Sequence, residues 1–327
     1  RHIDVSGEVC FPHSLGVLYT AVCQWLGFSK YGDEGKVMGL SAYGKPRHLE
    51  RLRSLLRLRD DGFELALRYF RHHREGVDMT FADGTPALGR LFSPALCDLL
   101  GAPRQPGPGI EREEYFCDVA ASLQALLEEG VLHICRNLAL RTGLKRLCLA
   151  GGVALNCVAN GRILDESGFQ ELFIQPAAGD NGTSVGAALW VWNQLLEKPR
   201  RFVMHHAYTG QSFDAAACRA ALHQLFASGE ASPELFSVEE LSETACVERA
   251  AADLDAGAVL GWFQGRMELG PRALGHRSIV ADPRRAEMKD VLNRRIKHRE
   301  PFRPFAPSVR SESTRLNSSH ANVSRMP

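Results

Sequence analysis

The sequence predicts an α/β protein with two regions. Between residues 146 and 196, two apolar strands each run into a glycine-containing turn and then into a helical stretch. This is the pattern of an α/β core with ligand loops at strand ends. Apolar residues at helical spacing between positions 116 and 141 predict a long helix as well. The length of 327 residues favours two domains, because one domain typically has ~100 to 200 residues.

The composition excludes several classes of protein. Hydrophobic residues make up 45% and charged residues 24% of the chain, which argues against a disordered or fibrous protein. A net charge of +1 gives no overall attraction to nucleic acid or anionic lipid. Nine cysteines without a C-x-x-C pair predict reduced, mostly buried thiols. Because the sequence has neither a long apolar run nor a signal peptide at its start, we expect a cytoplasmic protein without membrane contact.

The predicted elements follow in order along the chain. A helix is expected over residues 14–28, and a glycine-rich loop follows it. Residues 83–110 carry many Pro and Gly and are predicted to be a loop, whereas residues 202–233 are predicted to be a polar connection. The other predicted elements are helix 116–141, strand 146–150, strand 172–175, helix 184–196, helix 239–254 and strand 258–263.

The two ends of the chain differ from the rest. Residue 1 is Arg, and residues 8–13 read like the interior of a domain. We therefore expect sequence upstream to be missing. Residues 310–327 are rich in Ser, Asn and Arg and lack apolar periodicity, so we expect them to be a non-native or disordered tail.

A first glycine loop resembles a phosphate-binding loop without matching it fully. The segment Gly39-Leu-Ser-Ala-Tyr-Gly44-Lys45-Pro46 places Pro46 where that motif has Ser or Thr, so the hydroxyl that would bind magnesium is missing. Such a loop could still bind phosphate through backbone N–H groups at a helix start. The alternative is a plain capped turn.

Two further glycine loops follow the predicted strands 146–150 and 172–175. The first is Gly151-Gly152-Val153-Ala-Leu-Asn156, and the second is Gly179-Asp180-Asn181-Gly182-Thr-Ser184. Glycines after a buried strand let the backbone approach a ligand, and the following helix offers unpaired N–H groups. Tight turns without a ligand would need the same residue types. Because both loops belong to one α/β core, we predict that they close around one nucleotide, with Asp180 available for a metal.

A dense group of basic residues lies near the end of the chain. Gly270-Pro-Arg272-Ala-Leu-Gly275-His276-Arg277-Ser278 is followed by eight further Arg and Lys residues up to Arg303, among them Arg284, Arg285, Arg294, Arg295, Lys297 and Arg299. Some of these must be solvated surface, because exposure is the default for charged side chains. The mixture of Gly, Pro and Arg nevertheless favours a convergent oxyanion site over a simple charged helix.

These segments together resemble a known family, the carbamoyltransferases that modify nodulation factors, aminoglycosides, cephamycins and novobiocin-type antibiotics. The resemblance covers nearly all of residues 8 to 309. It is carried by Phe11-Pro-His-Ser-Leu-Gly16, Lys36-Val-Met-Gly-Leu40, Gly44-Lys-Pro46, Gly151–Asn156, Gly179–Gly182, Gly270–Ser278 and Arg299-Glu-Pro-Phe-Arg-Pro-Phe-Ala-Pro307.

The resemblance implies an architecture of two domains. Residues 1–201 would be the C-terminal part of an actin-like ATPase domain similar to the threonylcarbamoyl transferases, incomplete at its N-terminus. Residues 202–309 would be a domain similar to threonylcarbamoyl-adenylate synthase, incomplete at its C-terminus. Both are α/β folds. A homodimer is left open.

The resemblance also implies a chemistry in two steps. Carbamoyl phosphate and ATP would give carbamoyl adenylate and pyrophosphate in the second domain, and a hydroxyl of a small-molecule acceptor would then attack the adenylate at the glycine loops. Activation is needed because the carbamoyl nitrogen lone pair makes the carbonyl a poor electrophile. The residues implied in activation are Arg272, His276, Arg277, Ser278, Lys297, Arg299 and Arg303. The residues implied in binding ATP are Lys36, Gly39, Gly151, Gly152, Val153, Asn156, Asn181, Gly182 and Ser184.

One metal ligand can be carried over from the family, namely Asp180. The metal would be divalent, iron or magnesium, and the family's remaining ligands would lie before residue 1. We therefore expect this chain to be inactive in carbamoyl transfer. Two alternatives remain open, a tRNA threonylcarbamoyl-type transferase and a non-catalytic nucleic-acid-binding module, although nucleic acid is the less favoured partner given the neutral charge balance.

Overall fold

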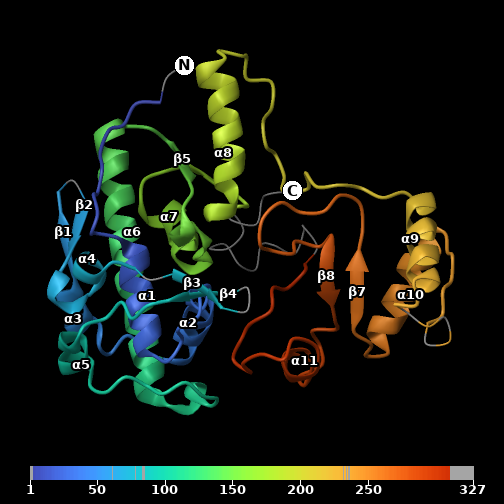
Figure 1. The fold of residues 1–327 in the computed structure, drawn as a ribbon, viewed down its shortest axis with the longest axis horizontal. Coiled ribbons are helices and arrows are strands. Elements are labelled where there is room, and N and C mark those ends of the chain that lie inside the picture. Colours follow the sequence, from blue (N-terminus) through green and yellow to red (C-terminus); the bar gives the residue numbers. More distant parts are fainter. Residues whose placement is uncertain are drawn as a thin grey trace. The chain divides into compact units, whose positions relative to one another are not determined.

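A computed structural model describes residues 3–309 apart from residues 61, 78, 83, 84, 231, 233 and 235. The chain divides into two compact units (Figure 1). The first unit contains the residues up to Pro199 together with the segment that begins at Lys297, and the second unit is Arg200–Ile296. Residues 297–309, which the sequence analysis grouped with the second region, thus pack with the first unit. The tail 310–327 lies outside the described residues.

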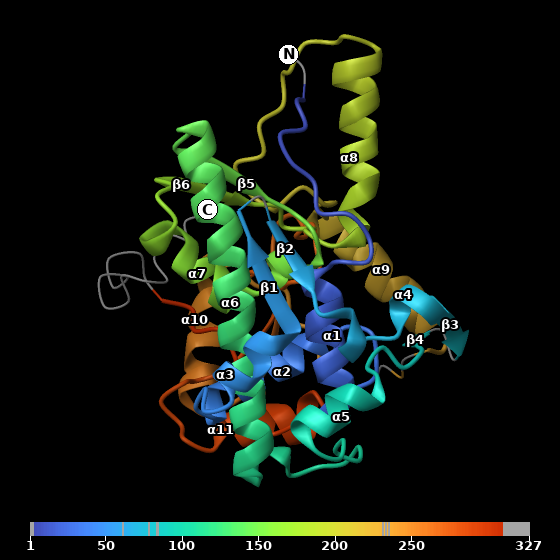
Figure 2. The same cartoon turned by 90° about the vertical axis from the view of Figure 1, so that its left-hand side faces the viewer.

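Two helices organise the core of the first unit. Helix α1 (Leu15–Trp25) begins where the Ser14 hydroxyl accepts a hydrogen bond from the N–H of Val17, at 3.3 Å. Helix α6 (Glu114–Thr142) is 29 residues long and ends at Gly143, whose φ of +65° suits a helix C-terminus. Figure 2 shows α6 running past several shorter elements. Both helices were predicted from apolar periodicity, and both predictions are confirmed.

Shorter elements surround these two helices in the first unit. In chain order they are α2 (Glu34–Leu40), η1 (Ser41–Tyr43), α3 (Leu49–Leu52), η2 (Arg53–Leu55), β1 (Leu56–Arg59), β2 (Gly62–Leu65), η3 (Leu67–Tyr69), α4 (His72–Glu75), β3 (Met79–Ala82), β4 (Thr85–Leu88), α5 (Pro94–Leu100) and η4 (Ile110–Arg112). The pairs β1–β2 and β3–β4 are antiparallel. The core contains large buried side chains from α1, α6 and the segment around Phe302.

A parallel strand pair follows α6. Strand β5 (Arg146–Leu149) pairs with β6 (Glu171–Ile174), with Leu147 opposite Leu172. Each strand leads through one turn of 3₁₀ helix, η5 (Gly152–Leu155) or η6 (Asp180–Gly182), into a helix, α7 (Cys157–Glu166) or α8 (Thr183–Trp190). A π-helical turn, η7 (Val191–Leu195), extends α8. The two predicted strand-turn-helix units are therefore present.

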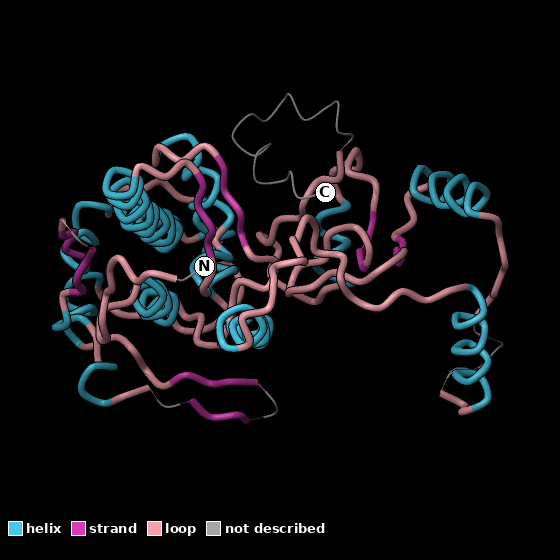
Figure 3. Tube along the Cα trace, turned by 90° about the horizontal axis from the view of Figure 1, so that it is seen from above, coloured by secondary structure: helices cyan, strands magenta, loops and turns pink. Residues whose placement is uncertain are grey.

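The second unit is a smaller assembly. It contains α9 (Ala215–Ala227), α10 (Glu243–Asp255), the antiparallel pair β7 (Leu260–Phe263) and β8 (Arg277–Val280), α11 (Met288–Val291) and the π-helical turn η9 (Leu292–Ile296). Its buried apolar residues are few, among them Ala207, Met288 and Leu292. Each of the four sheets in the described part of the chain has only two strands. Figure 3 draws the strands in magenta. The result is a mixed α/β chain.

Three predictions from the sequence are wrong. Residues 83–110 are not only loop, because α5 lies within them, and the predicted connection 202–233 contains α9. Helix α9 has no buried residue, although Cys218, Leu222, Leu225 and Phe226 follow each other at helical spacing. The cysteines are free but not mostly buried, since five of the nine are exposed. No described helix is both long enough and apolar enough to cross a membrane.

Candidate functional site

The two predicted glycine loops lie side by side at the carboxyl ends of β5 and β6. The N–H of Gly151 donates a hydrogen bond to the carbonyl oxygen of Ala178 at 2.7 Å, which joins the first loop to the second. Gly151 has a φ of +102°, a conformation that favours glycine. Gly151 and Gly152 are exposed, and Val153 is half-buried. The arrangement leaves backbone at the ends of parallel strands open to a ligand, which is where open α/β sheets bind one.

The second loop is closely packed at its base and exposed at its tip. A Cβ on Gly182 would lie 2.0 Å from the carbonyl oxygen of Ala177, so the position requires glycine. Asp180, Asn181 and Ser184 are exposed. The Ser184 hydroxyl donates to the carbonyl oxygen of Asn181 at 3.2 Å and thereby holds the loop at the start of α8.

Tyr31 is a residue of this site that the sequence analysis missed. Its hydroxyl donates to Oδ2 of Asp180 at 3.3 Å, although the two residues are far apart in the sequence. Partial burial and then the neighbouring Asp180 carboxylate raise the pKa of Tyr31, so the phenol stays protonated and able to donate. No local motif marks Tyr31, because only the folded chain brings it to the second glycine loop.

The described residues do not form a metal site on their own. No three His, Cys, Asp or Glu side chains in the described part of the chain are placed to share a metal ion. Asp180 could supply one carboxylate ligand, and the partner that the structure shows for it is the Tyr31 hydroxyl. The residues present therefore do not fit a complete metal centre.

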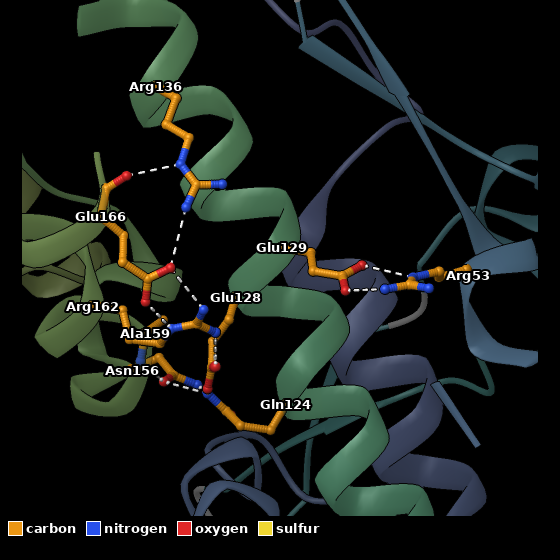
Figure 4. A network of polar contacts seen from close by, with 9 residues as sticks. All are labelled: Arg53, Gln124, Glu128, Glu129, Arg136, Asn156, Ala159, Arg162 and Glu166. Carbon is orange, nitrogen blue, oxygen red and sulfur yellow. Dashed lines mark hydrogen bonds and ion pairs between the residues drawn. The ribbon is translucent and has the colours of Figure 1, made fainter. Parts of the chain in front are cut away.

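Asn156 is held in a polar network instead of pointing freely at a ligand (Figure 4). Its Oδ1 accepts from the N–H of Ala159 and from Nε2 of Gln124, both at 3.0 Å, and its Nδ2 donates to Oε1 of Gln124 at 2.9 Å. Gln124 also donates to Glu128 at 2.8 Å and accepts from the Tyr19 hydroxyl at 3.0 Å. Asn156 thus caps α7 and joins it to α6, which fixes the helix that follows the first glycine loop.

The network continues through a chain of charged residues along the α6–α7 contact. Arg162 donates to Glu128 at 2.5 Å and to Glu166 at 2.6 Å, and Arg136 donates to Glu166 at 3.1 Å. Because several members share partners, the network is stiffer than an isolated surface ion pair. By joining α7 to α6, the network fixes the helix that follows the first glycine loop.

Lys36 and Gly39 contact the segment that begins at Lys297. The Lys36 ammonium lies 2.9 Å from Asp33 and 2.7 Å from Glu300. Burial lowers the pKa of Lys36, but its bonds to Glu300 and Asp33 outweigh this and raise it. A Cβ on Gly39 would lie 3.2 Å from Cδ of Pro304. In this structure both predicted ATP-binding residues serve to seat the segment 297–309.

The loop that resembles a phosphate-binding loop is packed against α6. The N–H of Lys45 donates to Asp118 at 2.7 Å, and the N–H of His48 donates to the Ser122 hydroxyl at 3.0 Å. A Cβ on Gly44 would lie 2.1 Å from the carbonyl oxygen of Cys117. The backbone donors that would cradle a phosphate are therefore used within the chain. Of the two interpretations open from the sequence, the packed turn is the one that the geometry supports.

The predicted oxyanion loop of the second unit is built around Glu268. Its Oε1 accepts from the N–H of Leu274 at 2.7 Å and from the N–H of His276 at 2.8 Å, and its Oε2 accepts from Nε of Arg277 at 2.9 Å. Burial raises the pKa of Glu268, but these donors outweigh it and lower the pKa to about 2. Glu268 was not among the predicted site residues, and its spacing to Arg277 gives no recognisable motif.

His276 and Ser278 hold the same loop. The Ser278 hydroxyl accepts from the N–H of Gly275 at 3.0 Å. Nδ1 of His276 lies 2.8 Å from the carbonyl oxygen of Arg266, and its ring stacks on Tyr208 with centroids 3.9 Å apart. The Tyr208 hydroxyl donates to the carbonyl oxygen of Leu274 at 3.0 Å. These contacts give both predicted catalytic residues a supporting role in the structure.

The basic residues of this region differ sharply in what they contact. Arg277 is bound to Glu268, Arg266 to the carbonyl oxygen of Gly210, and Arg284 to Asp282 and Asp255. Arg272 is exposed and has no hydrogen bond or ion pair with the described residues. Lys297, Arg299 and Arg303 belong to the first unit. In the second unit, Arg272 is thus the predicted anion-binding cation that remains available.

Comparison with known proteins gives matches along most of the chain. Residues 2–189 match the family model for the carbamoyltransferase N-terminus, and residues 251–325 match the model for the carbamoyltransferase C-terminus. The chain is 40% identical over 312 residues to nodulation protein NolNO of Sinorhizobium fredii, a match that covers 94% of this chain and 41% of that protein.

Two further relatives extend the comparison. Nodulation protein NolO of Bradyrhizobium diazoefficiens is 40% identical over 309 residues, covering 93% of this chain and 50% of NolO. The 3'-hydroxymethylcephem-O-carbamoyltransferase of Streptomyces clavuligerus is 32% identical over 206 residues, covering 62% of this chain and 35% of that protein. The chain spans half or less of the length of these relatives.

Proposed function

The chain belongs to the carbamoyltransferase family, and on this premise we propose that it acts in an ATP-dependent transfer of a carbamoyl group to a hydroxyl of a small molecule. Carbamoyl phosphate would lose its phosphate to water, and the carbamate oxygen would attack the α-phosphorus of ATP with release of pyrophosphate. The acceptor hydroxyl would then attack the carbonyl carbon, its proton would pass to solvent, and AMP would leave.

The observation that carries this proposal is the junction of the two glycine loops. Gly151 is bonded to Ala178 at 2.7 Å, and the exposed tip with Asp180 and Asn181 lies beside the exposed Gly151 and Gly152. A nucleotide fits such a place because backbone N–H groups at helix starts attract phosphate. We assign Gly151, Gly152, Val153, Asn181, Gly182 and Ser184 to binding of the adenylate. Lys36, Gly39 and Asn156 would act indirectly, by seating the segment 297–309 and by fixing α7.

Activation is assigned to the oxyanion loop of the second unit. Arg272 would hold the phosphate group of carbamoyl phosphate, because a guanidinium matches phosphate geometry with two parallel hydrogen bonds. Arg277, His276 and Ser278 would keep that loop in shape. Lys297, Arg299 and Arg303 remain proposed contacts for ATP or carbamoyl phosphate.

The finer identity of the fold and of the acceptor is part of the same proposal. We assign the first unit to an actin-like ATPase fold, with β5–α7 and β6–α8 supplying its nucleotide loops, and the second to an adenylate-synthase-like fold. One relative is named a nodulation protein, and the name of another gives the hydroxymethyl group of a cephem as its acceptor. A small molecule with a free hydroxyl is the class we propose for this chain.

The experiment is carbamoyl-phosphate-dependent exchange of labelled pyrophosphate into ATP. We expect exchange with the chain, and at least about tenfold less with Arg272→Ala, since a charge-assisted bidentate contact is lost. Arg295→Ala is the matched control, because Arg295 is an exposed arginine of the same unit without a described partner. The full-length 3'-hydroxymethylcephem-O-carbamoyltransferase of Streptomyces clavuligerus serves as positive control.

The result can contradict the proposal in two ways. Exchange in the cephem carbamoyltransferase but none in this chain would show that the second unit does not activate carbamoyl phosphate by itself. Equal loss in the Arg272 and Arg295 variants would show that bulk charge, and not the loop, binds the anion. Because the described residues form no complete metal centre, we expect no carbamoylated acceptor from this chain alone, a point that mass spectrometry of the acceptor checks.

A further inference from the structure

Among the ion pairs of the second unit's described residues, Glu268 is the carboxylate with the least exposed side chain. Its side chain has no exposed surface, whereas its partner Arg277 is partly exposed. An enclosed charge is costly unless hydrogen bonds compensate it. Here two backbone N–H groups and one guanidinium converge on the two carboxylate oxygens. The compensation comes from the loop 270–277, so the carboxylate and the loop depend on each other.

The loop conformation explains why the backbone donors can reach one carboxylate. Gly270 and Gly275 have φ values of +100° and +104°, which favour glycine and turn the chain sharply at both ends of the segment. The turns direct the N–H groups of Leu274 and His276 inward onto Oε1 of Glu268. The segment Pro271–Ala273 between them stays exposed.

The exposed part of the loop carries Arg272. Three backbone groups next to it are fixed, since Leu274, Gly275 and His276 each donate to a side chain of the second unit. The carbonyl oxygens of Gly275 and His276 in turn accept from Gln264. Residues 274–276 of the loop are therefore fixed by hydrogen bonds, whereas Arg272 is exposed to solvent.

From these contacts we infer that Glu268 is a positioning residue for anion binding, which sets the loop so that Arg272 meets the phosphate group of carbamoyl phosphate. This inference rests on the proposed function of Arg272. Glu268 does not touch the substrate. It acts through the N–H groups of Leu274 and His276 and through Arg277.

The test measures the dissociation constant of carbamoyl phosphate and the KM values of the exchange reaction for Glu268→Ala and Glu268→Gln. Misplacing a binding group by about 1 Å can cost on the order of a hundredfold. We expect Glu268→Ala to weaken carbamoyl phosphate binding at least about tenfold with the KM for ATP unchanged. Glu268→Gln keeps one acceptor oxygen for the N–H groups but turns an NH₂ group toward Arg277, so we expect a smaller loss.

Asp282→Ala is the matched control. Asp282 is also a buried carboxylate of the second unit, and it binds Arg284 through backbone and side chain without touching the loop 270–277. We expect this variant to bind carbamoyl phosphate like the wild type. Amide hydrogen exchange should rise at Leu274 and His276 in Glu268→Ala and not in Asp282→Ala.

The possible outcomes separate the two proposals. If the wild-type chain does not bind carbamoyl phosphate at all, the proposed function fails and this inference fails with it. If Arg272→Ala loses binding while both Glu268 variants bind like the wild type, only the positioning role is overturned. If Glu268→Ala does not fold, Glu268→Gln decides, and a KM for carbamoyl phosphate equal to that of Asp282→Ala overturns the inference.

Discussion

Single residues decide where backbone segments can approach each other in this protein. A Cβ on Gly182 would lie 2.0 Å from the carbonyl oxygen of Ala177, and a Cβ on Gly44 would lie 2.1 Å from that of Cys117. Real Cβ contacts are never so short, and the neighbouring atom is backbone in both cases. These two glycines therefore permit the second glycine loop and the packing of the Gly44–His48 turn on α6.

We predict that Gly182→Ala destabilises the first unit by about 3 kcal/mol, because the added methyl forces backbone to move in a packed site. Gly186→Ala is the control. Gly186 lies in α8 with nothing within 4 Å of its added Cβ, so alanine should stabilise the helix by up to about 1 kcal/mol. Urea denaturation of both variants measures the difference. Similar midpoints for the two would mean that the Ala177 contact relaxes at little cost.

Acid should weaken the second unit through Glu268. Its pKa is about 2 in the folded chain and about 4.3 in an unfolded chain. A lowered pKa contributes stability that is present above about pH 5 and is lost as the pH falls toward 2. We expect the urea midpoint of the second unit to fall over this range, and less so in Glu268→Gln. Parallel pH curves for wild type and variant would contradict this origin of the acid sensitivity.

At the scale of elements, helix α6 holds two neighbouring parts of the first unit in place. One part of the helix holds the Gly44–His48 turn through Asp118 and Ser122, and another holds α7 through Gln124 and Glu128. Burial raises the pKa of Asp118, but the N–H of Lys45 and the guanidinium of Arg47 outweigh it and lower the pKa. Polar side chains on the buried face of α6 thus position both the Gly44–His48 turn and α7.

The junction of α6 with α7 can be tested at Asn156. In Asn156→Ala we expect a loss of about 2 kcal/mol, roughly 1 from the helix cap and the rest from the stranded Gln124 amide. Asn156→Asp keeps the cap to Ala159 but loses the donor to Gln124 and adds a third carboxylate to Glu128 and Glu166 of the network. Thermal denaturation should therefore rank the variants as wild type, Asp and Ala from most to least stable. If Asp equals wild type, the Gln124 pairing contributes nothing measurable.

At the scale of the whole chain, residues far apart in the sequence complete the first unit. The segment 297–309 places Phe302, which is 2% exposed, near the rings of Phe28 and Tyr43, at centroid distances of 6.4 and 6.2 Å. The ion pair between Lys36 and Glu300 lies beside it. The core of the first unit is therefore completed by a segment that follows the second unit in the sequence.

We predict that Phe302→Ala destabilises the first unit by about 3 kcal/mol, because a large buried aromatic side chain is removed. Phe305→Ala is the control in the same segment. Phe305 is half-buried and stacks with the Arg299 guanidinium at 4.6 Å, an interaction worth about 1 kcal/mol or less. Urea denaturation, followed by a signal from the first unit, measures the loss of stability in each of the two variants. Equal effects would show that the segment packs only loosely.

Several features of the fold could be predicted from local sequence. Helices α1 and α6 have apolar residues at helical spacing, the strands β5 and β6 are short apolar runs, and glycines mark the two loops between strand and helix. These signals lie within a few residues of each other, so local geometry is enough to reveal them. Helix α9 was missed although Cys218, Leu222, Leu225 and Phe226 have helical spacing, and none of its residues is buried in the structure.

The basic residues show what only the tertiary structure decided. In the sequence analysis, Lys36 is assigned to ATP, and Arg272 and Arg277 are assigned to the anions of the activation step. In the fold, Lys36 is paired with Glu300 and Arg277 with Glu268, whereas Arg272 is exposed without a described partner. The sequence by itself determined the α/β elements, the glycine loops and the family resemblance. Which cations remain available depends on charges brought together by folding, and such long-range pairing leaves no pattern in a local stretch of sequence.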